Sequence, residues 1–129
     1  MRIANRPLVA FPGTYALCLS KKEYEQTLKQ LNVVADPKTA WLIDGAAATT
    51  HYFVPESGGM ARVCIVCLGD RAGKSVEQVN AILTHEAVHI WQEIRDMIGE
   101  DKPSREFEAY AIQGIAQELM ELMNQELQP

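Results

Sequence analysis

The sequence predicts a single α+β domain with a small antiparallel or mixed sheet and an N-terminal helix, packed on two long C-terminal helices. Short runs rich in β-branched and aromatic residues occupy much of the first half of the chain. Two segments with hydrophobic residues at three- and four-residue intervals fill the second half. The chain has 129 residues, 47% of them hydrophobic, which is enough to form one hydrophobic core. We therefore expect residues 1–129 to form a single domain.

The N-terminal third of the chain predicts an extended segment followed by a helix. Residues 7–19 are apolar and interrupted by a Pro-Gly pair, which is typical of an extended stretch around a turn. Ser20 and Glu23 have capping-box spacing, so we expect a helix to begin here and to end near Leu31.

Three strands are predicted in the middle of the chain. Residues 40–43 form a short candidate strand before an Asp-Gly turn. Residues 49–54 and 61–68 are rich in β-branched and aromatic side chains and flank a Pro- and Gly-containing segment. These two runs predict a hairpin with a loop longer than two residues.

The last half of the chain predicts two helices. The first runs from Val76 to about Ile98, with a capping-like start at Ser75 and Gly99 as its C-terminal cap. Ser104 can cap the last helix. The buried stripe of that helix is expected to contain Ala111, Ile112, Ile115, Leu119 and Leu122.

Charge and composition exclude several classes of protein. Twelve basic and seventeen acidic residues give a net charge of -5 without a basic patch, so we expect no nucleic-acid partner. No apolar window approaches the roughly 18 residues that cross a bilayer, and the N-terminus lacks a signal-peptide pattern. We therefore expect a cytoplasmic protein with no membrane partner. The odd set Cys18, Cys64 and Cys67 is interpreted as buried free thiols.

The stretch LTHEAVHIWQ, in the first long helix, carries a candidate metal site. His85 and His89 are four residues apart, so on a helix they lie about 40° from each other and can face one ion. Glu86 follows His85 and can address a water bound to that ion. This is the H-E-x-x-H arrangement of zinc hydrolases, which makes Zn²⁺ the expected cofactor.

The position of the histidines on the helical wheel favours metal binding. With His85 at zero, the apolar stripe is centred at roughly 160° and the histidine pair at roughly 20°. The pair therefore faces away from the core, where satisfied core histidines would not lie. Two exposed surface histidines without a ligand remain the alternative.

A catalytic zinc usually has three protein ligands, and two glutamates compete for the third position. His51 is interpreted as a strand-surface residue. On the wheel of the last helix Glu106 faces away from the core and Glu108 toward it. An antiparallel return of that helix, however, places Glu106 about 10 Å along the axis from His89 and Glu108 somewhat nearer. The two criteria favour different residues.

His85-Glu86-Ala87-Val88-His89 followed by Glu106-Phe107-Glu108-Ala109-Tyr110 resembles the gluzincin metallopeptidases. The second helix of these enzymes carries a glutamate ligand in a pattern close to E-x-x-A-D, and the resemblance covers about residues 76–120. It implies a zincin-like architecture, with Glu106 as third ligand and Tyr110 where the pattern has an aspartate. The layout is also similar to small metallopeptidase-like proteins encoded by phages and prophages.

The expected function is zinc-dependent hydrolysis of peptide bonds in a peptide or protein substrate. His85, His89 and Glu106 would hold the metal, Glu86 would activate the water, and Tyr110 or a nearby donor would stabilise the oxyanion. The resemblance also implies peptide binding along an edge strand. The alternatives are a catalytically silent binding module on the same fold and a metal hydrolase of non-peptide substrates. Glu86 favours an enzyme, because a structural site needs no base.

Overall fold

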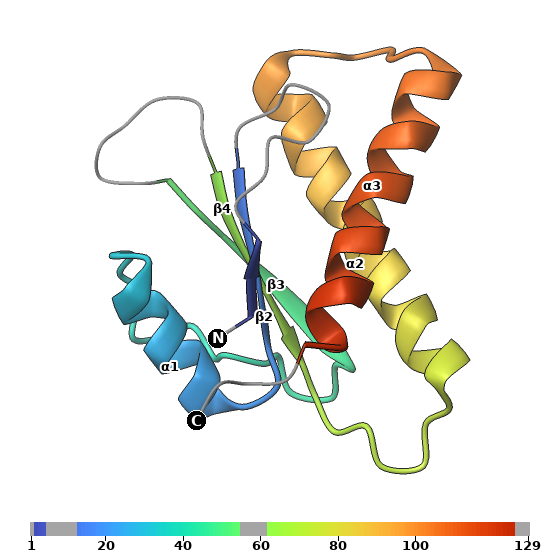
Figure 1. Ribbon diagram of the computed structural model, residues 1–129. Helices are drawn as coiled ribbons and strands as arrows, with labels where there is room; N and C mark the ends of the chain where they lie inside the picture. The colour runs from blue at the N-terminus through green and yellow to red at the C-terminus, as the bar shows by residue number, and fades with distance from the viewer. Residues whose placement is uncertain (1, 5–12, 55–61, 126–129) are drawn as a thin grey trace.

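The computed structural model describes residues 2–4, 13–54 and 62–125 as an α+β arrangement, which confirms the predicted class. A sheet lies between one helix on one side and two helices on the other (Figure 1). The elements in chain order are β1 (Arg2–Ala4), β2 (Gly13–Cys18), α1 (Lys21–Gln30), β3 (Ala48–Phe53), β4 (Arg62–Leu68), α2 (Val76–Ile98) and α3 (Arg105–Met123).

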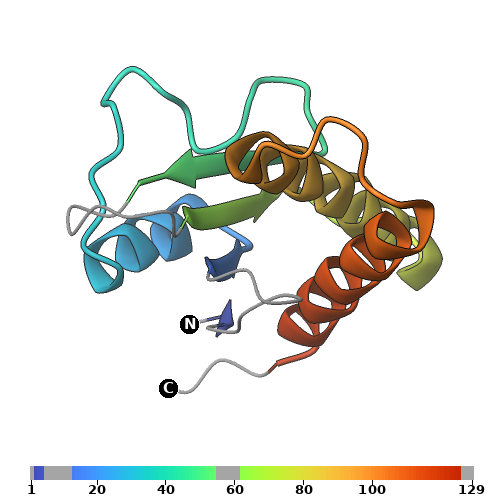
Figure 2. The same cartoon turned by 90° about the horizontal axis from the view of Figure 1, so that it is seen from above.

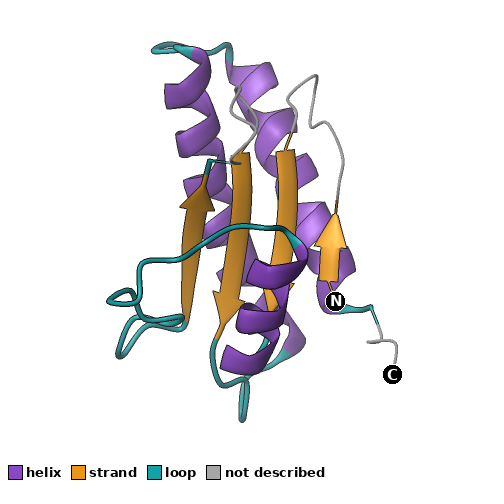
Figure 3. Cartoon of the chain, turned by 90° about the vertical axis from the view of Figure 1, so that its left-hand side faces the viewer, coloured by secondary structure: helices purple, strands orange, loops and turns teal. Residues whose placement is uncertain are grey.

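The sheet is mixed, with strand order β1-β2-β4-β3. β2 and β4 are parallel neighbours in the centre, while β1 and β3 pair antiparallel on the outside (Figure 3). Parallel neighbours need a crossover connection, and α1 lies in the chain between them. The antiparallel pairing of β3 with β4 confirms the pairing expected of the predicted hairpin. Its connecting residues 55–61 lie outside the described part of the chain.

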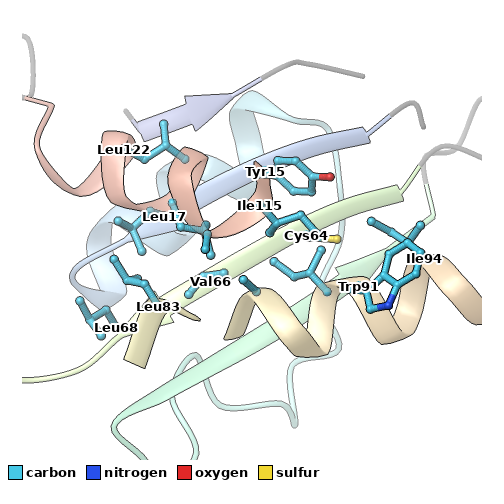
Figure 4. Packing of buried hydrophobic residues seen from close by; sticks show 14 of the residues in the cluster. Tyr15, Leu17, Cys64, Val66, Leu68, Leu83, Trp91, Ile94, Ile115 and Leu122 are labelled. Atoms are coloured by element: carbon cyan, nitrogen blue, oxygen red, sulfur yellow. The ribbon is translucent and has the colours of Figure 1, made fainter. Parts of the chain in front are cut away.

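β4 is buried on both faces, which explains its nearly continuous apolar sequence. One face, with Cys64, Val66 and Leu68, joins β2, α2 and α3 in the larger hydrophobic cluster (Figure 4). The other face, with Ile65 and Cys67, packs in a second cluster with residues of β2 and α1.

α2 and α3 divide the same face of the sheet between them. α2 contacts β3, while α3 contacts β2 and β1 and packs along α2 (Figure 2). Local signals set the ends of these helices as the sequence predicts. Ser75 and Gln78 form a reciprocal capping box, Gly99 adopts a left-handed conformation with φ 74°, and the Ser104 hydroxyl accepts from the backbone of Phe107.

The structure differs from the sequence-based expectations before β3. Residues 40–43 form no strand, so that prediction was wrong. Side chains of β3 hold this segment instead: Thr49 Oγ1 accepts from Ile43 N at 2.9 Å, and His51 Nε2 lies 2.8 Å from Trp41 O. The interpretation of His51 as a strand-surface residue was also wrong, because it is only 8% exposed, against Tyr24.

At the N-terminus, β1 was not predicted, since three residues are too few to show alternation. Of the extended segment predicted over 7–19, residues 13–18 form β2, whereas 7–12 lie outside the described residues.

Candidate metal and catalytic site

The two histidines of α2 lie together on its exposed surface, as the helical wheel predicts. Their Nε2 atoms are 3.2 Å apart and their rings meet edge to face. Two zinc–nitrogen bonds of about 2.0–2.1 Å at a tetrahedral angle separate the nitrogens by about 3.3–3.4 Å. The spacing of His85 and His89 therefore fits two ligands of one zinc ion.

A neighbouring amide favours one tautomer of His89. Its Nδ1 lies 3.1 Å from Oε1 of Gln92, one turn further along α2. An amide oxygen can only accept, so this contact is a hydrogen bond in the tautomer that carries its hydrogen on Nδ1 and its lone pair on Nε2. The nitrogen that faces His85 is thus the one that can bind a metal, and Gln92 fixes the orientation of the ring.

Glu86 is the charged residue of this group that is turned toward the sheet. It is 6% exposed, and its Oε2 accepts a hydrogen bond of 3.0 Å from Thr50 Oγ1 of β3. A buried carboxylate is costly unless it is hydrogen-bonded, so Thr50 offsets part of this cost and fixes the side chain. The Thr50 contact leaves Oε1 of Glu86 for other partners.

A hollow of about 450 Å³ opens beside Glu86. Its walls come from the start of β3 with the residues before it and from the second turn and middle of α2. The lining residues are Ala46, Ala47, Ala48, Ala81, Ile82, His85 and Glu86. Four alanines leave room for a ligand, and the two site residues are its charged or titratable groups. Space for a reacting molecule therefore adjoins the candidate base.

Glu108 is held on a different flank of α2. Its Oε2 accepts a hydrogen bond of 2.8 Å from Nε1 of Trp91, whose ring also packs edge to face on Phe107. Trp91 is two residues after His89 and thus about 160° from it around the helix. The Trp91 contact turns Glu108 away from the histidines.

Glu106 and Tyr110 lie on the exposed side of α3, as expected for Glu106 from its position on the wheel; Tyr110 is 61% exposed. The described part of the chain contains no group of three or more His, Cys, Asp or Glu side chains placed to hold a metal. The structure therefore brings together the two histidines and places Glu86 beside them, but it does not bring Glu106 into the same group.

Thr50 is a site residue that sequence reasoning missed. The signal for it was the period-two alternation of β3, in which Ala48, Thr50 and Tyr52 share one face. Which helix that face would meet depends on the strand order, which the sequence alone does not reveal.

The three cysteines are buried free thiols, as predicted. Burial raises the pKa of Cys64 to about 12, and the charge of Glu93 adds to this effect while Arg62 opposes it. Cys18 lies next to Cys67 in the parallel β2–β4 pair, and its Sγ is 3.4 Å from Thr27 Oγ1. These thiols are on the sheet and take no part in the histidine site.

The fold and site thus define an α+β protein with an H-E-x-x-H helix beside an edge strand. Comparison with family models, curated proteins and solved structures found no match for the chain. Among the described residues, no helix is both long and apolar enough to cross a membrane.

Proposed function

We propose that this protein is a zinc-dependent metallopeptidase of the gluzincin type, with a zincin-like fold and a cytoplasmic location. The observation that carries the proposal is the combination of two exposed imidazoles with ligand spacing and a buried, anchored glutamate next to them. A site that only stabilised the fold would not need a carboxylate held in this position. His85 and His89 are two of the ligands, and Glu106 is the third.

Glu106 is chosen as the third ligand because its carboxylate has no other partner among the described residues. Glu108 already accepts a hydrogen bond from Trp91, whereas Glu106 is exposed in the first turn of α3 and has no partner among the described residues. Its carboxylate is therefore not engaged by another described group, and the pattern Glu106 to Tyr110, which resembles that of the gluzincins, points to the same residue. Tyr110 is proposed as a donor near this ligand.

Glu86 performs the proton transfers in the proposed reaction. When bound, the zinc ion supplies Lewis acidity at the scissile carbonyl. Oε1 of Glu86 takes a proton from the attacking water, whose oxygen forms a bond to the carbonyl carbon. Oε1 of Glu86 then delivers that proton to the amide nitrogen as the carbon–nitrogen bond breaks. Thr50 keeps Oε2 in place, which leaves Oε1 for the proton transfers.

A peptide substrate is favoured by the strand that borders the site. β3 is an edge strand of the described sheet and carries the anchor of Glu86. An extended peptide can add to such an edge through main-chain hydrogen bonds. A second hollow, of about 430 Å³, lies between residues 50–53 of this strand and the segment 34–39, on the α1 side of the sheet. A peptide on this edge would pass close to Glu86.

The substitution Glu86→Gln tests the proposed base. The amide oxygen of the new side chain can still accept from Thr50, but the amide cannot take a proton. We therefore expect the variant to keep its zinc and to lose peptide turnover by at least about 100-fold. The measurement is cleavage of a quenched fluorescent peptide library, with zinc content determined in the same preparation. Equal turnover in the variant and in the parent protein would rule out Glu86 as the base.

A further inference from the structure

The face of β3 that looks toward α2 carries a second functional candidate beyond Thr50. Along this strand Thr49, His51 and Phe53 alternate with Ala48, Thr50 and Tyr52. Phe53 packs in the cluster on the α1 side of the sheet and lies near His51. Ala48 packs in the cluster under α2 and α3, and Thr50 reaches Glu86. Tyr52 is therefore on the α2 side of the edge strand.

β3 runs in the same direction as α2 where the two meet. Ala48 shares a hollow with residues 81–86, and Thr50 contacts Glu86. Alternate residues of a strand are about 6.6 Å apart, and four residues of a helix rise about 6 Å. Tyr52 thus lies about one helical turn past Glu86, beside the turn of α2 that contains His89.

The electrostatic surroundings of Tyr52 agree with this position. Burial raises the pKa of its phenol, and the charges of Cys64, Glu86 and Glu93 raise it further. The phenol therefore keeps its proton at neutral pH and remains a hydrogen-bond donor. Its side chain is 36% exposed, so a bound peptide can reach it.

We infer that Tyr52 is a catalytic residue of the proposed reaction, whose phenol donates a hydrogen bond to the scissile carbonyl oxygen. This inference rests on the proposed function. Negative charge builds on that oxygen when water attacks the carbon, and a fixed donor stabilises it. The phenol keeps its proton throughout, and the carbonyl re-forms when the carbon–nitrogen bond breaks. Tyr110, on α3, is not needed for this role.

Two matched substitutions test the inference, Tyr52→Phe and Tyr15→Phe, each of which removes one hydroxyl. Tyr15 is buried in the core on β2, and its hydroxyl has no hydrogen-bond partner among the described residues. We expect kcat to fall by about 10²–10³-fold in Tyr52→Phe, with KM, zinc content and melting temperature unchanged. Tyr15→Phe should keep kcat within about twofold of the parent protein. A phosphinic peptide, which mimics the tetrahedral arrangement, should bind Tyr52→Phe more weakly by a factor similar to the loss of kcat.

The possible outcomes distinguish a failure of the role of Tyr52 from a failure of the proposed peptidase activity. Parent-like kcat and phosphinate affinity in Tyr52→Phe would overturn the role of Tyr52 and leave the peptidase proposal standing, as would an equal loss of kcat in Tyr15→Phe. A parent protein that binds zinc but cleaves no peptide would overturn both. A change in KM or melting temperature alone would also overturn the inference, because the phenol would then only position or pack.

Discussion

Thr50 connects the candidate base on α2 to the edge strand of the sheet. Its hydroxyl is the described hydrogen-bond partner of Glu86, which is otherwise enclosed by the interface of β3 and α2. A buried carboxylate that loses such a partner keeps its desolvation cost without compensation. The same bond therefore supports the stability of the fold and fixes the orientation of the Glu86 carboxylate.

The substitution Thr50→Val keeps the shape of the side chain and removes its donor. We expect the free energy of unfolding to fall by about 1–3 kcal/mol, because Glu86 stays buried without its hydrogen bond. Urea denaturation measures the change, and Thr39→Val, at an exposed position, is the matched control. If both variants unfolded at the same urea concentration as the parent protein, the Thr50–Glu86 bond would contribute nothing to stability.

At the scale of elements, local sequence signals predict where the helices begin and end, but they do not predict the strand order of the sheet. Ser75, Gly99 and Ser104 mark helix ends by capping chemistry that involves only neighbouring residues, so α2 and α3 were predicted closely. The order of strands depends on long-range pairing, which leaves no local trace. For this reason the sequence could predict that the histidines face outward but not that Thr50 would meet Glu86.

α3 carries both candidates for the third zinc ligand. Glu108 accepts a hydrogen bond from Trp91, whereas Glu106 is exposed. We expect Glu106→Gln to weaken zinc binding by about tenfold or more, since an amide replaces a charged ligand. Glu108→Gln is the matched control, because its amide oxygen can still accept from Trp91. Competition with a chelator measures both affinities. A loss of zinc in the control but not in Glu106→Gln would reverse the assignment.

At the scale of the whole molecule, the sheet separates the smaller hydrophobic cluster, on the α1 side, from the larger cluster and the candidate site, on the side of α2 and α3. On the α1 side, His51 and the neighbouring thiols Cys18 and Cys67 are buried in or beside the smaller cluster. On the other side, α2 buries its apolar stripe against the sheet and turns His85 and His89 outward. The core thus fixes the backbone that carries the candidate site, while the two proposed histidine ligands stay exposed to solvent.

The most direct measurement is the zinc content of the purified protein, determined by elemental analysis without added metal or chelator. We expect about one zinc per chain in the parent protein and in Asp96→Ala, an exposed substitution on the same helix. His85→Ala and His89→Ala should each abolish binding, since one imidazole and one carboxylate are too few protein ligands to hold the ion. Unchanged zinc content in both histidine variants would contradict the account.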